Sequence, residues 1–132
     1  MKSGAWALSG AALLTAMAWA SAASATSPEF DKCVDKSGGV TIAMRNCASA
    51  EEDRQDRDLN AFYKQAMARR DAAGRDELRT QERAWLKLRV QKCHKVLMET
   101  EGTAGLLAYD DCWLETNDKR VAELKALAEG RP

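Results

Sequence analysis

The sequence predicts an all-α protein, a small antiparallel bundle of about three main helices with a short N-terminal helix before them and two disulfides. After residue 25, glycine and proline are sparse and no strand-like alternation of apolar and polar residues appears. Amphipathic segments are separated by short glycine-containing turns. Four cysteines bracket two of these turns almost symmetrically, as they would in disulfide-linked helical hairpins.

The first 25 residues have the composition of an export signal. Lys2 is followed by an apolar run rich in Ala, Leu and Trp, and then by small residues that fit A-x-A cleavage sites. The candidate cleavage residues are Ala22, Ala23 and Ala25. A transmembrane anchor is the alternative, but the apolar run is shorter than the roughly 20 residues that span a bilayer. We expect a signal peptide over 1–25 and one helical domain over 26–132, periplasmic or secreted, with no stable membrane anchor after cleavage.

The charge of the expected mature chain is close to balanced. Lys and Arg number 20, Asp and Glu also number 20, and of these only Lys2 falls in the leader. Nucleic acid or an anionic membrane as partner would call for a clear basic excess. We therefore expect neither, and the interspersed charges predict solvated helix faces.

The first two helices follow from capping residues and breakers. Residues 27–29, Ser-Pro-Glu, form an N-cap, a first-turn proline and an acidic first turn, which open a short helix that runs to about Lys36. The next residues, Ser37-Gly38-Gly39, end it. A long helix is predicted over about 41–72, with Gly74 as its breaker.

The last two helices are predicted over about 76–100 and 106–128. A glycine-containing turn over 101–105 separates them. The first of the two carries a broad apolar face that includes Leu78, Trp85 and Cys93. Such helices with short turns between them pack as antiparallel neighbours.

The four cysteines, in an exported chain, indicate a disulfide framework. Cys33 and Cys47 are nearly equidistant from Gly38-Gly39, and Cys93 and Cys112 from Gly102. Antiparallel helices joined by a short turn bring such positions face to face, which favours the local pairs. Two long-range bridges, such as Cys33–Cys112, are the alternative. Each local loop would contribute about 3 kcal/mol in the chain-entropy model.

Residues 51–58 contain no apolar side chain for two helical turns. Either the helix leaves the bundle there, or Ser49 starts a new helix with Glu52 in a capping box. The simpler interpretation of the run is a solvated, salt-bridged face. A sharper hypothesis makes the run an exposed acidic surface for a basic partner, with Glu51, Glu52 and Asp53 as contacts.

The residue content argues against catalysis. His94, the single histidine, follows Cys93, but adjacent helical residues project about 100° apart and do not face each other. The chain lacks the C-x-x-C, H-E-x-x-H and glycine-rich phosphate-loop motifs. We predict a protein that is not an enzyme, with no catalytic residues, no metal site and no cofactor.

Gln81, Trp85, Arg89 and Cys93 form a stripe at intervals of four residues. An arginine in an apolar stripe must find an acceptor or reach solvent. The candidate acceptors are Asp56, Asp58 and Asp111. We interpret Gln81, Trp85 and Arg89 as a structural stripe with a partly buried ion pair, and a polar groove open to a ligand is the alternative.

The stripe belongs to a longer pattern. Met44-Arg45-Asn46-Cys47 is followed by LNAFY at 59–63, LRTQERAWLKLR at 78–89, Cys93, Cys112 and RVAEL at 120–124. Over roughly residues 31 to 127 the chain resembles the LprI-like lysozyme inhibitor (N-terminal domain) family of small exported bacterial proteins. The resemblance implies an all-helical, disulfide-bonded envelope domain and inhibition of a lysozyme through protein–protein contact. The chain lacks the lipid-accepting cysteine of lipoprotein members, which favours a soluble form.

We therefore predict a binding protein that blocks the substrate cleft of a lysozyme, where two carboxylates do the chemistry. The turn residues Glu101, Gly102 and Thr103 are the second predicted partner contact beside the acidic run. A disulfide at the base of this turn would reduce the cost of ordering it on binding. The alternative is a periplasmic structural or interaction module with another partner.

Overall fold

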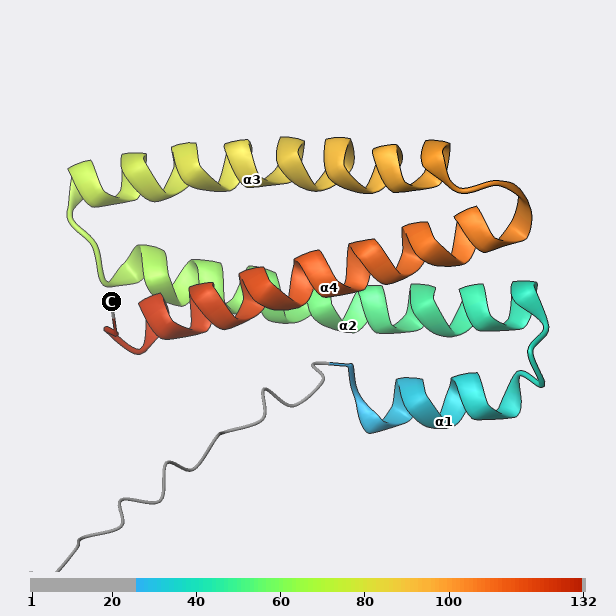
Figure 1. Cartoon of the computed structure of the whole chain (residues 1–132). Coiled ribbons are helices and arrows are strands. Elements are labelled where there is room, and N and C mark those ends of the chain that lie inside the picture. Colours follow the sequence, from blue (N-terminus) through green and yellow to red (C-terminus); the bar gives the residue numbers. More distant parts are fainter. Residues whose placement is uncertain (1–25, 132) are drawn as a thin grey trace, which may run out of the picture.

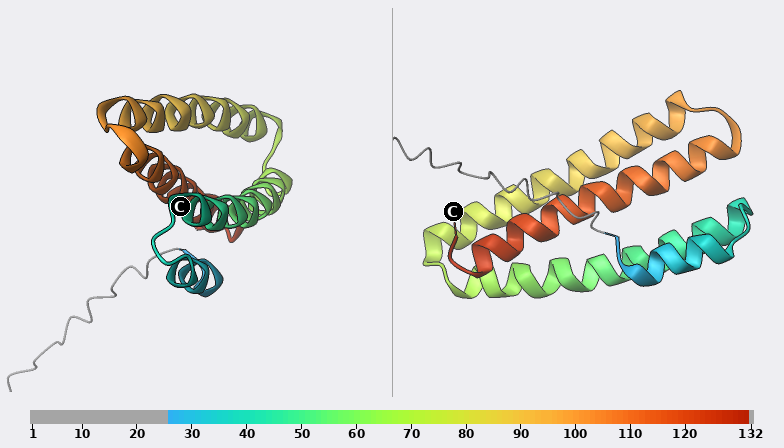
Figure 2. Two further views of the ribbon diagram at one scale, coloured as in Figure 1. Left: turned by 90° about the vertical axis from the view of Figure 1, so that its right-hand side faces the viewer. Right: turned by 60° about the horizontal axis from the view of Figure 1, so that its bottom comes forward.

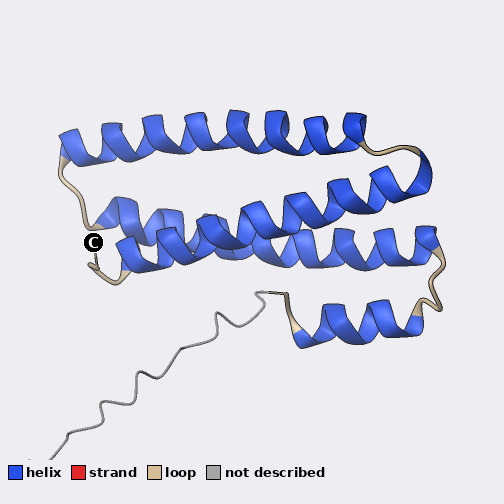
Figure 3. Cartoon of the chain, in the orientation of Figure 1, coloured by secondary structure: helices blue, strands red, loops and turns tan. Residues whose placement is uncertain are grey.

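The computed structural model describes residues 26–131, and the predicted signal peptide lies outside them. The described chain folds into four helices, α1 (Pro28–Lys36), α2 (Thr41–Ala68), α3 (Ala72–Glu99) and α4 (Gly102–Ala128) (Figure 1). Between residues 26 and 131 there is no strand (Figure 3). The predicted fold class, three main helices with a short one before them, is confirmed.

Helix α4 is the centre of the bundle. It packs along both α2 and α3, whereas α2 and α3 contact each other little (Figure 2). The short helix α1 packs against α2 alone among the described helices. Helices α2 and α3 are therefore held together mainly through α4.

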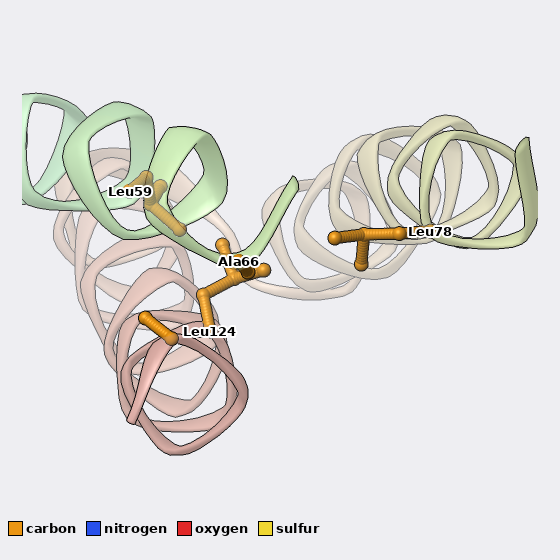
Figure 4. Packing of buried hydrophobic residues seen from close by; sticks show 5 residues of the cluster. Leu59, Ala66, Leu78 and Leu124 are labelled. Carbon is orange, nitrogen blue, oxygen red and sulfur yellow. The ribbon is translucent and has the colours of Figure 1, made fainter. Parts of the chain in front are cut away.

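The apolar core lies near the turn that joins α2 to α3. Leu59, Ala66, Leu78 and Leu124 are almost completely buried there and come from all three long helices (Figure 4). The partly buried side chains packed against them are Phe62, Tyr63, Met67, Trp85, Val121 and Leu127. Burial of this apolar cluster stabilises one end of the bundle.

The two disulfides hold the helices together toward the other end. Cys33 is bonded to Cys47 between α1 and α2, and Cys93 to Cys112 between α3 and α4. Their Cα atoms lie 5.7 and 5.5 Å apart. The local pairing predicted from the turn symmetry is confirmed, and the long-range alternative is wrong.

The break between α2 and α3 is displaced from the predicted position. Helix α2 ends at Ala68 and α3 begins at Ala72, so Gly74 lies in the first turn of α3. Asp71 is the N-cap, and its Oδ1 accepts a hydrogen bond of 2.9 Å from the Gly74 N–H. The break predicted at Gly74 is wrong by about one turn, because an aspartate cap starts the helix before the glycine.

The turn between α3 and α4 is shorter than predicted. Only Thr100 and Glu101 separate the two helices, and Gly102 already begins α4 with φ of 65°, in the left-handed region. Gly105 is buried in the first turn, and a Cβ at this position would overlap the Thr100 carbonyl oxygen. Glycine at 105 therefore lets the two helices approach closely.

The acidic run lies inside α2, which continues without interruption through Ser49 and residues 51–58. This selects the continuous helix over a new helix at Ser49. None of the helices within 26–131 combines the length and the apolar composition of a membrane span.

Candidate functional site

A groove of about 390 Å³ runs between α2 and α3. Its α2 side carries Asp56 and Tyr63, and its α3 side carries Arg79, Arg83 and Arg89. The groove exists because α4 keeps the two helices apart beyond their shared turn. The sequence had offered a polar groove open to a ligand as an alternative for the Arg89 stripe, and ligand binding in this groove stays a prediction.

Arg89 lies at the groove between two aromatic rings. Its guanidinium carbon is 4.7 Å from the ring centroid of Trp85 and 4.1 Å from that of Trp113. Its Nη1 donates a hydrogen bond of 2.6 Å to Asn117 Oδ1 and lies 3.9 Å from Asp56 Oδ1. Two ring faces and a neutral amide therefore supply most of the close contacts of this charge.

Burial is the main influence on the ionisation of Arg89. The side chain is only 12% exposed, and this burial lowers the pKa of the guanidinium although Asp56 and Glu52 oppose the shift. Burial likewise raises the pKa of Glu52, and the nearby Asp56 carboxylate raises it further. A guanidinium keeps its charge over the physiological range, so the groove retains a fixed cation at its inner wall.

The residues of the predicted stripe are evenly spaced in sequence, but they do not share one environment in the structure. Trp85 packs against the core and Cys93 is buried, as the interpretation required. Gln81 is exposed and donates to Glu77 Oε1 at 3.1 Å. Because positions four apart drift by about 40° around a helix, one end of the stripe faces solvent.

The partners of Arg89 were predicted in part. Asp56 was among the three candidate acceptors, but it lies at the limit of an ion pair. Asn117 is the closer partner, and the sequence reasoning missed it together with the second ring, Trp113. The sequence did contain a sign of this shared contact, because Trp113 and Asn117 are four residues apart and so share a face of α4.

A second cation, Arg120 of α4, was also missed. Its Nε and Nη2 donate to Glu82 Oε2 of α3 at 2.9 and 2.7 Å, and its Nη1 donates to Glu123 Oε2 at 2.9 Å. Burial opposes the charge, yet the hydrogen bonds to Glu123 and Glu82 raise the pKa of Arg120 above its usual value. This ion pair joins α3 to α4 beside the groove.

The centre of the bundle is polar. Gln55 of α2 is buried and donates through Nε2 to the Leu114 carbonyl of α4 at 3.0 Å. Four buried side-chain atoms in this region lack a hydrogen-bond partner within the described residues: Gln55 Oε1, Arg89 Nε, Trp113 Nε1 and Asn117 Nδ2. Buried polar side-chain atoms from α2, α3 and α4 therefore occur together in this part of the bundle.

The predicted acidic surface is partly buried. Glu51 is 3% exposed and accepts hydrogen bonds from Ser27 N at 2.8 Å and Ser27 Oγ at 2.6 Å, and from Arg54 Nη2 at 2.6 Å. Its carboxylate therefore anchors the start of α1, and it is not exposed as the hypothesis required. Glu52 is half-buried and Asp53 is exposed. A role of these two residues in partner binding stays a prediction.

Replacing Glu51 with Gln is expected to lower the unfolding free energy by about 1 kcal/mol at neutral pH. Burial raises the pKa of this carboxyl, but the hydrogen bonds from Arg54 and Ser27 outweigh burial and the net shift is downward. A lowered folded-state pKa gives stability that is present above the ordinary carboxyl pKa and is lost as pH falls through the folded value. The difference between E51Q and the unsubstituted protein should therefore shrink as the pH falls below the ordinary carboxyl pKa, and close once the pH is below the lowered folded-state pKa.

Urea unfolding at a series of pH values checks this expectation. D53N is the matched control, because it removes a neighbouring carboxylate that is exposed. The anchoring role of Glu51 is contradicted if E51Q and D53N unfold alike at neutral pH, or if the E51Q difference persists unchanged in acid.

Glu101, Gly102 and Thr103 are all exposed. The connection between α3 and α4 lies at one end of the bundle (Figure 1). Glu101 precedes α4, and the other two form its first turn. They lie close in sequence to the buried Cys93–Cys112 bridge. Their partner-binding role stays a prediction.

Comparison with known families identifies the chain. The model of the family described as lysozyme inhibitor LprI matches residues 33–124. The chain belongs to the LprI lysozyme inhibitor family. The match to LprI includes all four cysteines and both walls of the groove. No curated protein and no solved structure gives a significant match to this LprI-family chain.

Proposed function

We propose that this LprI-family protein binds a lysozyme and inhibits it by protein–protein contact outside the cytoplasm. The observation that carries the proposal is the family match over residues 33–124. The two disulfides support it, because such bonds persist in the oxidising compartments where lysozymes meet cell walls. The helices are held by these bonds before any partner arrives, which reduces the ordering cost of binding.

The proposal is tested with the purified, oxidised protein and a panel of lysozymes. Lysis of bacterial cell walls is followed by the fall in turbidity, and binding is measured by titration calorimetry. We expect inhibition of at least one lysozyme that saturates with increasing protein. The absence of both inhibition and binding at micromolar protein would refute the proposal, whereas binding without inhibition would favour the envelope interaction module.

The predicted contacts are tested separately from the function. Variants replace Asp53 with Lys and residues 101–103 with Ser-Gly-Ser, and their inhibition is compared with that of the unsubstituted protein. Inhibition that persists in both would discard these contacts and leave the function in place.

A further inference from the structure

Helix α3 is the least covered of the three long helices. Only Leu78 and Cys93 are buried in it, whereas α2 has six buried residues and α4 has eight. It packs along α4 and stands clear of α2 beyond their common turn (Figure 2). A partner therefore has access to most of the circumference of α3.

The charge of α3 differs from that of every other described helix. It carries seven Lys and Arg residues against four Asp and Glu, while α2 has four against five and α4 has three against five. Helix α1 has two against three. Among the described helices, a net positive charge is therefore found on α3 alone, the most accessible of the three long ones.

One face of α3 combines this charge with apolar side chains. Arg79, Arg83 and Lys87 follow one another at intervals of four residues and are all exposed. Leu86 and Val90 lie among them, 41% and 52% exposed. We call these five residues the α3 face.

The α3 face has the features of a recognition surface. Leu86, Lys87 and Val90 line an open, largely apolar hollow, and Arg79 and Arg83 border the groove toward α2. Arg83 and Lys87 form no ion pair with any residue of the described chain. Unpaired cations next to exposed aliphatic side chains lose little internal stabilisation when a partner covers them.

We propose that the α3 face is the surface that enters the substrate cleft of the lysozyme, an inference that rests on the proposed function. That cleft is concave and carries two working carboxylates. Apart from the side that packs on α4, helix α3 is a convex ridge about 10 Å wide, and the cations on this ridge complement the carboxylates in charge. Leu86 and Val90, which lie among these cations, supply apolar contact with the cleft.

The ridge is preorganised for this role. The Cys93–Cys112 bridge fixes one end of α3 on α4, and buried Leu78 fixes the other end in the apolar core. The Arg120–Glu82 ion pair holds the middle. A helix fixed at three points needs no further ordering of its backbone, which reduces the cost of binding.

The test compares two double charge reversals in full-length protein. R83E/K87E changes the α3 face, and K64E/K119E is the control, with the same change of net charge at exposed positions of α2 and α4. Both are assayed against a lysozyme that the unsubstituted protein inhibits. R83E/K87E should weaken binding about tenfold or more at low salt, with a smaller loss at high salt, and the control by less than about twofold.

Two further measurements test the apolar contacts and the location of the contact on the lysozyme. L86A/V90A should weaken binding several-fold without a salt dependence, because it removes apolar contact and no charge. A chitooligosaccharide that fills the lysozyme cleft should compete with the unsubstituted protein for binding. Circular dichroism and thermal unfolding verify that each variant is folded.

The outcomes separate the inference from the proposed function. If R83E/K87E inhibits as strongly as the unsubstituted protein, the α3 face is not the contact, and the proposed function is unaffected. The same holds for equal losses in the two charge reversals, or for binding that the oligosaccharide does not displace. If the unsubstituted protein inhibits and binds no lysozyme, the proposed function fails and the inference fails with it.

Discussion

Replacing both Cys93 and Cys112 with Ala is expected to lower the free energy of unfolding by about 3 kcal/mol, a large part of the stability of a domain this small. The bridge closes a loop whose ends are 19 positions apart, and it joins α3 to the central helix α4. Because α3 has little contact with α2, contacts with α2 cannot replace the bridge that holds α3 on α4. Urea unfolding of the oxidised protein and the variant, followed by circular dichroism, measures the difference.

The other bridge provides the comparison. C33A/C47A removes a bond of similar span, 14 positions, but α1 has no buried residue. Its loss should release α1 and leave the unfolding of α2 to α4 nearly unchanged, which hydrogen exchange can resolve helix by helix. Equal destabilisation of the three long helices by the two double variants would contradict this assignment of roles.

The Arg120→Met substitution is expected to cost about 2 to 3 kcal/mol, because it leaves Glu82 without its partner. The side chains of Arg120 and Glu82 are 8% and 17% exposed, so the unpaired carboxylate is only weakly solvated. The E82M/R120M double variant should recover most of the loss, since replacing both members of a buried pair by apolar residues is often nearly neutral. A urea-unfolding double-mutant cycle gives the coupling between the two residues.

An exposed pair on the same helix is the control. Lys119 and Glu115 are 65% and 61% exposed, and K119M should change the unfolding free energy by less than about 0.5 kcal/mol. A coupling energy for Arg120 and Glu82 no larger than that of this surface pair would show that the buried contact does not hold α3 to α4.

Much of the fold could be predicted because its determinants are local. The Ser27-Pro28 start of α1 and the glycine turns appear in short stretches of sequence, and the cysteine spacing about those turns predicted both bridges. The break at Gly74 was misplaced because a strong N-cap three residues earlier overrides a glycine, which the first turn of a helix tolerates.

The site was less predictable because its contacts depend on how the helices are placed against one another. Arg120 and Glu82 are 38 positions apart, and no pattern within one helix pairs them. Glu51 read as a solvated carboxylate, but the start of α1 folds back over it and supplies two donors. The groove follows from the position of α4 between α2 and α3, which a single sequence does not reveal.

The pairing of the cysteines also has a consequence for assembly. Each cysteine is bonded to its nearest cysteine neighbour in sequence, the first to the second and the third to the fourth. A chain that enters an oxidising compartment from its N-terminus can close the first bridge before the third cysteine arrives. An oxidase that joins thiols in order of emergence then produces the native bonds directly, and isomerisation through mixed disulfides is not required.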